Sequence, residues 1–261
     1  MIWDKVTPKF IAGALAVILI SLFLDGSNPV ILIKPAPLIL VVGGTICASF
    51  AGIMRKDSKT VRGVLRAAFK SPVRDPAEDI SKMVHLAEVA RRDGLLALEA
   101  AASDVDDPFF RKGIEMTVDG TDPDEIREIL EGEIAALKAR HRAGAKFFTD
   151  MGGFSPTLGI LGTVIGLVHV LANLSTPKAL GPAISSAFTA TLWGVLLANI
   201  VWLPIANKLK RVSELEVYSK ELILEGILAI QEGSSPRMIE AKLQSYIPPK
   251  ERTNLREKKS A

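Results

Sequence analysis

Four uncharged apolar runs divide the chain and predict membrane-spanning helices. The runs without Asp, Glu, Lys or Arg are 10–24, 35–54, 151–177 and 179–207. A transmembrane helix needs about 20 predominantly apolar residues, and a flanking lysine can extend its charged end to the interface. Pro8 and Lys9 therefore lengthen the first run. We predict spans at about residues 8–24, 35–54, 151–172 and 180–205.

The charged segments between and after these runs have the period of helices. Residues 77–90 place apolar side chains on one face, and we expect Gly94 to end that helix. A long helix is predicted from Thr121, which we take as its N-cap, and no obvious break separates it from the third span. The fourth span is likewise expected to continue until Gly233, followed by one short helix.

These patterns predict an all-α integral membrane protein, because no alternating strand pattern or internal repeat occurs. We expect its helical cytoplasmic domain to combine the middle segment with the C-terminal tail. The predicted parts are spans one and two in 1–54, a cytoplasmic helical segment in 55–150, spans three and four in 151–207, and a cytoplasmic tail in 208–261.

The distribution of basic residues predicts the orientation. Of the 32 Lys and Arg, only Lys34 and Lys178 lie in the short links between paired spans. Positive residues favour the cytoplasmic side. We therefore predict a multi-pass protein of the bacterial cytoplasmic (inner) membrane with both termini in the cytoplasm. The modest net charge of +3 gives no support to a nucleic-acid partner.

Small and hydroxylated residues follow one face of each of the last two spans. In span three, Gly152, Pro156, Gly159, Thr163 and Gly166 recur at steps of three and four. Span four has a similar stripe of Ala187, Thr191, Gly194 and Ala198. Such residues let helices pack closely in lipid. The threonines either bond their own i−4 carbonyl groups or line a wet path for an ion.

The spans contain no carboxylate. Asp25 and Asp150 lie at opposite edges, and His169 is the one titratable group within span three. An acid inside a membrane normally serves an ion or proton path, so a partner must supply it if this chain moves ions. We expect no enzymatic activity, catalytic residue, metal site or cofactor, because the sequence has no nucleotide loop and no cluster with metal-ligand spacing.

Several long segments resemble one family. The stretch SPTLGILGTVIGLVHVLANLSTPKALGPAISSAFTATLWGVLLANIVWLPIANKLK resembles spans three and four of the MotA/PomA flagellar stator proteins, within the MotA/TolQ/ExbB proton channel superfamily. The resemblance continues in ARRDGLLALEA, DPFFRKGIEMTVDGTDP and EGILAIQEGSSPRMIEAKLQSYI. These segments occur in the family's order and extend over nearly the whole chain.

The resemblance implies a flagellar motor stator subunit that converts ion-motive force into torque for motility. Family members form a pentameric ring around a MotB/PomB dimer, whose transmembrane aspartate this chain lacks. Ion flow past that aspartate is thought to turn the ring against the rotor protein FliG. The transported ion is H⁺ or Na⁺.

The resemblance also assigns site residues. Pro156 and Pro204 match prolines tied to conformational change during ion passage, and Thr191 matches a threonine that faces the ion site. Thr163 matches a position that is threonine in sodium-driven members and often alanine in proton-driven ones, which favours Na⁺. With Gly159 and Gly166, these residues form the predicted ion pathway and interface with the partner helix.

In the cytoplasmic segment, Arg91 or Arg92, together with Glu99, matches family charges that engage FliG. The two adjacent arginines leave the register open, so both stay candidates. Read without the resemblance, these charges are a solvated helix face.

The alternatives are other membrane proteins. An ExbB/TolQ-type energiser has one span before its cytoplasmic segment, whereas two are predicted here. A phage-defence relative has a longer helical tail. A secondary transporter subunit normally has broken helices and binding groups at mid-membrane, of which Pro156 is the one hint.

Overall fold

The computed structural model describes residues 2–3, 6–26, 28–54, 61–71, 76–102 and 105–247. The chain forms two compact units, and each contains segments that are distant in sequence. The first, which we call the membrane unit, comprises residues 1–71 and 141–212. The second unit comprises residues 72–140 and 213–261.

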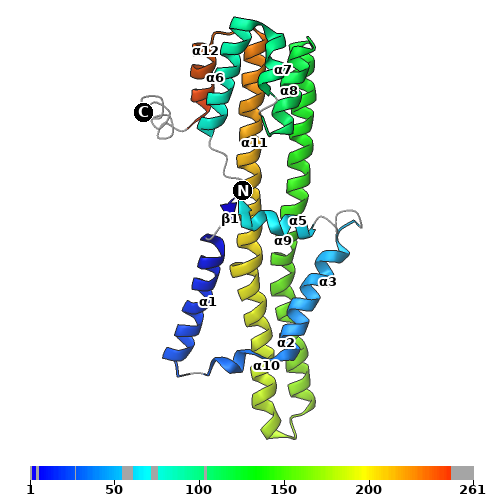
Figure 1. Cartoon of the computed structure of the whole chain (residues 1–261). Coiled ribbons are helices and arrows are strands. Elements are labelled where there is room, and N and C mark those ends of the chain that lie inside the picture. Colours follow the sequence, from blue (N-terminus) through cyan, green and yellow to red (C-terminus); the bar gives the residue numbers. More distant parts are fainter. Residues whose placement is uncertain are drawn as a thin grey trace. The chain divides into compact units, whose positions relative to one another are not determined.

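The membrane unit consists mainly of apolar helices (Figure 1). Its elements before the second unit are α1 (Val6–Leu24), the 3₁₀ turn η1 (Pro29–Leu32), α2 (Pro35–Leu38), the π-helix η2 (Ile39–Gly43), α3 (Gly44–Ala51) and α5 (Val61–Phe69). Its later elements are the second part of α9 (Pro123–Ala172), then α10 (Pro177–Leu196), the π-helix η4 (Leu197–Trp202) and the first part of α11 (Leu203–Gln231).

Three helices are long and apolar enough to cross a membrane: 6–24, 123–172 and 177–231. The predicted second span is a shorter apolar helix, Pro35–Ala51, which α2, η2 and α3 form together. At about 1.5 Å per residue it measures roughly 25 Å, slightly less than the roughly 30 Å of a bilayer core. The all-helical membrane character is confirmed, while the count of four spans stays a prediction.

The expected continuity of the last two spans with charged helices is confirmed. Helix α9 runs without interruption for 50 residues and contains Pro156. Residues Pro177–Gln231 form a single helical run of 55 residues. Within it, η4 precedes Pro204, and the amide of Leu203 bonds the Ala198 carbonyl five residues earlier. The wider turn accommodates a proline that cannot donate to the helix ladder.

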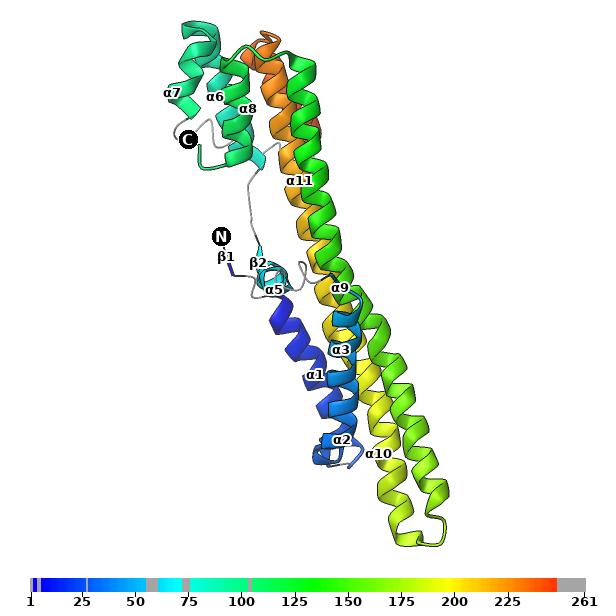
Figure 2. The ribbon, with the colours of Figure 1, turned by 90° about the vertical axis from the view of Figure 1, so that its right-hand side faces the viewer.

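The second unit consists of amphipathic helices packed side by side (Figures 1 and 2), and they enclose one hydrophobic core. Its elements are α6 (Pro76–Asp93), the 3₁₀ turn η3 (Leu95–Ala97), α7 (Leu98–Ala102), α8 (Pro108–Val118), the first part of α9, the second part of α11, and α12 (Pro236–Tyr246). The fully buried side chains include Ile80, Met83, Phe110, Ile126, Leu130, Ile227 and Ile239. Their spacing on each helix produced the predicted periodicity.

Glycines end the helices of this unit where the sequence predicted. Gly94 (φ 86°) follows α6, and Gly233 (φ 73°) follows α11. After α11, the amides of Gly233 and Ser234 bond the carbonyls of Ile230 and Ala229, which is the Schellman arrangement. A residue without a Cβ adopts the required left-handed conformation at little cost.

One sequence-based expectation is wrong in detail. Asp122, not Thr121, caps α9, because the Asp122 side chain accepts a hydrogen bond from the Asp124 amide at 2.9 Å. The fold also contains one antiparallel strand pair, β1 (Ile2–Trp3) with β2 (Lys70–Ser71). Two residues per strand are too short to produce an alternating pattern, so the sequence carried no signal for it.

The link between α1 and α2 is held against α10. The Lys34 ammonium donates to the Pro182 carbonyl at 3.3 Å and to the Ser185 hydroxyl at 2.9 Å. The Trp193 indole N–H donates to the Leu32 carbonyl at 2.7 Å. These bonds satisfy backbone carbonyls at the end of the membrane unit where the apolar helices turn back.

Candidate functional site

The backbones of α9 and α10 approach each other closely at glycines. A Cβ added to Gly194 would lie 2.6 Å from the Ser155 carbonyl oxygen, and one added to Gly159 would lie 3.0 Å from the Ala190 carbonyl oxygen. At Gly166, an added Cβ would lie 2.6 Å from the Ala187 Cβ. No larger residue fits these positions without moving a backbone. The small stripes therefore form a tight seam between spans three and four, as small residues do in lipid.

Thr163 and Thr191 meet across this seam. The Thr163 hydroxyl lies 3.2 Å from the Gly159 carbonyl oxygen and 3.1 Å from that of Ala187. The Thr191 hydroxyl lies 3.3 Å from the Gly159 carbonyl oxygen, and the two hydroxyls are hydrogen-bonded to each other. Four oxygens, two from each helix, converge at this point. Hydroxyl and carbonyl oxygens are hard ligands of the kind that small cations prefer.

Two hypotheses were open for the threonines: a bond to their own i−4 carbonyl group, or a lining for an ion path. The contacts in the structure are compatible with both. Thr163 does bond its own i−4 carbonyl, that of Gly159, but its hydroxyl also reaches α10. Each hydroxyl has a single proton, so it can donate to only one of these carbonyls at a time. The same pair that ties the helices together thus keeps oxygen lone pairs available between them.

The predicted ion-path residues are only partly brought together. Gly159, Thr163, Gly166 and Thr191 belong to the seam. Pro156 is seven residues before Thr163, roughly 10 Å along α9, and Pro204 is thirteen residues after Thr191, roughly 20 Å along its helix. The prolines therefore lie on the same two helices as the threonine pair, but at other levels.

No carboxylate belongs to this seam. Asp150, the nearest acid of α9, lies thirteen residues before Thr163 and forms an ion pair with Lys146 at 2.6 Å. Among the residues that the structure describes, no group of three or more His, Cys, Asp or Glu side chains could hold a metal ion. The site offers neutral oxygens and no anion.

The other predicted site residues lie in the second unit, around the turn between α6 and α7. Arg91 and Arg92 lie in the last turn of α6, and Glu99 lies in the first turn of α7. All three are exposed. Arg92 donates to the Asp93 carboxylate at 2.7 Å. That hydrogen bond, with the attraction between the charges, lowers the pKa of Asp93 and raises that of Arg92. Leu98, with an exposed fraction of 0%, anchors the turn in the core.

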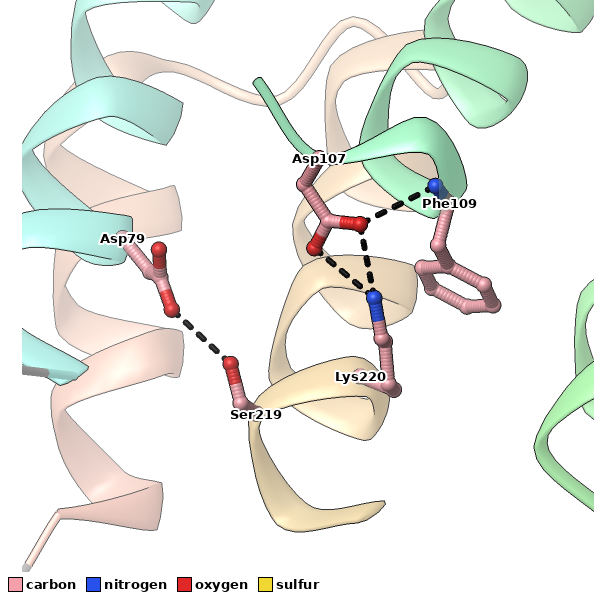
Figure 3. Close-up of polar contacts among 5 residues, drawn as sticks. All are labelled: Asp79, Asp107, Phe109, Ser219 and Lys220. Carbon is pink, nitrogen blue, oxygen red and sulfur yellow. Dashed lines mark hydrogen bonds and ion pairs between the residues drawn. The ribbon is translucent and has the colours of Figure 1, made fainter. Parts of the chain in front are cut away.

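The second unit buries a charge pair (Figure 3). The Lys220 ammonium of α11 lies 2.7 Å and 2.8 Å from the two carboxylate oxygens of Asp107, and 4.8 Å from the centre of the Phe109 ring. The Asp107 carboxylate also caps α8 by accepting from the Phe109 amide at 3.0 Å. One layer away, the Ser219 hydroxyl donates to Asp79 of α6 at 2.9 Å. Consecutive residues of α11 thereby hold α6 and α8.

Sequence reasoning missed the buried pair and the direct contact between the threonines. A signal for the first existed, because Lys220 is three residues after Val217 and four before Leu224, and both are buried. A charged residue on a buried helical face requires a partner. The pairing of Thr163 with Thr191 depends on the register of two helices, which periodicity alone does not fix.

The fold and the seam together define a class of protein. It is an all-helical membrane protein in which two spans form a close, carboxyl-free seam and continue as helices into a separate, charged unit. The chain matches the MotA/TolQ/ExbB proton channel family over residues 101–222.

Whole-chain relatives are more specific. Motility protein A of Bacillus subtilis (strain 168) is 40% identical over 259 residues, which cover 99% of this chain and 96% of that protein. Chemotaxis protein PomA of Vibrio alginolyticus is 36% identical over 94% of this chain and 95% of its own. A solved structure of the flagellar MotAB stator complex from Bacillus subtilis superposes with a TM-score of 0.88 at 41% identity, covering 95% and 97% of the two chains. The chain belongs to the MotA/PomA family of flagellar motor stator subunits.

Proposed function

We propose that this subunit forms a homo-oligomeric ring, a pentamer as in the family, around a MotB/PomB-like partner that supplies a membrane-embedded aspartate. The observation that supports this proposal is the composition of the seam. Four neutral oxygens converge there, and neither α10 nor the apolar part of α9 contains an acid. A carboxylate brought beside Thr163 and Thr191 would complete a cation site. Since Gly159 and Gly166 already pack against α10, the partner helix is expected to lie beside the seam. Pro156 and Pro204 are expected to take part in the movement that accompanies each ion.

The proposed topology has four spans in the bacterial inner membrane, with Pro35–Ala51 as the second. Both termini and the second unit are then cytoplasmic, as the placement of the basic residues favours. Labelling of single cysteines at Ser27 and Ser235 from each side of the membrane tests this orientation. Labelling of both positions from the same side would contradict it.

We propose Na⁺ as the coupling ion. Four oxygen ligands replace part of a sodium hydration shell, whereas a proton needs no such cage. The test is swimming speed at fixed proton-motive force in a strain that lacks its own stator genes and carries this chain with its partner. Speed should rise with external sodium, and Thr163→Ala should weaken that dependence. Speed independent of sodium would overturn the choice of ion.

The rotor contact is proposed at the α6–α7 turn, facing FliG, with Arg91 as the principal arginine. Arg92 is engaged by Asp93, whereas Arg91 and Glu99 have no hydrogen bond or ion pair with any residue that the structure describes. Arg91→Glu should reduce swimming more than Arg92→Glu at equal membrane levels. An equal or reversed order would refute this assignment without affecting the ion site.

A further inference from the structure

The membrane unit buries four polar side-chain groups that have no hydrogen-bond partner among the residues that the structure describes. They are the hydroxyls of Thr45, Ser49 and Ser155 and the indole N–H of Trp202. The exposed fractions of Thr45, Ser49 and Ser155 are 0%, 2% and 0%. We call these four groups the inner polar cluster, and they come from spans two, three and four.

The contacts between α3 and α9 place the first three groups at neighbouring levels. The two helices are antiparallel: Leu40 lies against Gly162, Gly44 lies against Leu158, and the Phe50 and Phe147 rings are 5.2 Å apart. This register brings Thr45 to the level of Ser155. Ser49, four residues later on the same buried face, is about one helical turn farther on.

The contacts between α9 and the last span place the fourth group. Gly194 lies against Ser155, and Gly152 lies against Leu203. Trp202 is therefore at the level of Gly152, about one turn from Ser155. The inner polar cluster thus occupies two adjacent levels of the membrane unit. Both levels are on the side of the threonine pair toward Pro204 and the segments that continue into the second unit.

Burial of these groups without partners is unfavourable. Each buried hydroxyl that lacks a hydrogen bond is destabilising, and native proteins satisfy such groups with protein or water. A bare cation does not suit the cluster, because the Trp202 indole only donates a hydrogen bond. Water accepts from the indole and both donates to and accepts from the hydroxyls, and a buried water typically makes about three hydrogen bonds.

We propose that the inner polar cluster binds ordered water within the membrane unit. A second step rests on the ion path proposed above. We assign this water to the cytoplasmic segment of that path, where an ion that leaves the threonine pair regains its hydration. The water-binding claim itself depends only on burial and on the missing partners. Thr45 and Ser49 thereby give span two a role in ion passage, although it contributes nothing to the seam.

Radiolytic hydroxyl labelling of the assembled complex in lipid nanodiscs tests the water site, because radicals formed from bound water oxidise adjacent buried side chains. Met151, one turn before Ser155 and 3% exposed, is the reporter. Met83, 0% exposed in the second unit, is the matched buried control, and Met54, 68% exposed, reports access from bulk water. Met151 should be oxidised several times faster than Met83. Equal rates at the two buried methionines would overturn the proposal.

The variant Thr45→Val/Ser155→Ala separates water binding from ion passage. If water is bound, the variant lowers oxidation of Met151 to the rate of Met83. If the groups are dry, it leaves labelling unchanged and raises the melting temperature, because two unsatisfied groups are removed. Loss of labelling with unchanged swimming speed would refute the ion-path role alone. Failure of the proposed function itself is measured separately, by the dependence of swimming speed on external sodium.

Discussion

The two units of this chain bury polar groups in opposite ways. The second unit buries a full charge pair, Lys220 with Asp107, inside an aliphatic core and compensates it with a helix cap and an aromatic ring. The membrane unit buries no charge in its seam and relies on hydroxyls, carbonyls and glycines. A fixed ion pair is suited to a rigid unit. Neutral oxygens are suited to a site that a cation occupies only transiently.

The same long helices therefore have different surroundings in the two units. Helices α9 and α11 each contribute to both units. In the membrane unit α9 forms the neutral seam with α10. In the second unit α11 carries Ser219 and Lys220, which hold α6 and α8. Within the second unit, α11 is therefore bonded directly to α6, the helix that carries Arg91 and Arg92.

The largest expected effect is loss of one partner of the buried pair. Lys220→Met removes the ammonium that lies 2.7 Å from the buried Asp107 carboxylate, and loss of one partner of a buried pair typically costs about 3–5 kcal/mol. Hydrogen exchange of the α8 amides should accelerate by roughly two to four orders of magnitude. Lys112→Met, at the exposed pair with Glu133, is the matched control and should change stability by under about 1 kcal/mol. Equal effects of the two variants would contradict the contrast.

The double variant Lys220→Met/Asp107→Asn sharpens this result. Asparagine keeps the α8 cap while the buried charge is removed together with its partner. Replacement of both charges of a buried pair is often close to neutral. Most of the stability lost in Lys220→Met should therefore return, as measured by the same amide exchange.

The next largest effect is expected at the seam. In Gly194→Ala, the added methyl group meets the Ser155 carbonyl oxygen at 2.6 Å, and overpacking of this kind costs about 1–3 kcal/mol. The melting temperature, followed by the fluorescence of Trp193 and Trp202, should fall. Gly181→Ala, in the same helix α10 but with no neighbour within 4 Å, should leave it unchanged or higher. A comparable fall in the melting temperature of both variants would show that close approach of the α9 and α10 backbones at Gly194 is not the cause.

The smallest effect concerns the exposed edge of the second unit. Burial disfavours the charged form of Glu225, but Lys242 at 2.7 Å and Arg127 at 3.3 Å outweigh it and lower the pKa of Glu225 below its usual 4.5. Stability from this group is present above the unfolded pKa and is lost as the pH falls through the folded pKa. Glu225→Gln should flatten the acid side of a stability–pH curve, and Lys242→Met should do the same. An unchanged stability–pH curve in both variants would contradict a stabilising role of the Glu225 ion pairs.

Much of this architecture followed from periodicity and charge segregation. The continuous helices α9 and α10–α11, the stops at Gly94 and Gly233 and the small seam were predictable, because each depends on local sequence. The charge of Lys220 on a buried helical face could be read from the sequence, but its pairing with Asp107, the threonine contact and the inner polar cluster could not. They depend on the register between helices, which close packing sets after the helices exist.

The central claim is that the membrane unit conducts no cation without an acid from another polypeptide. Ion flux in liposomes, with this chain reconstituted alone and then with its MotB-like partner, measures this most directly. The account predicts no flux above empty liposomes for the chain alone, flux with the partner when it is in its unplugged form, and loss of flux when the partner's membrane aspartate is replaced by asparagine. Sustained flux through the chain alone would contradict the account.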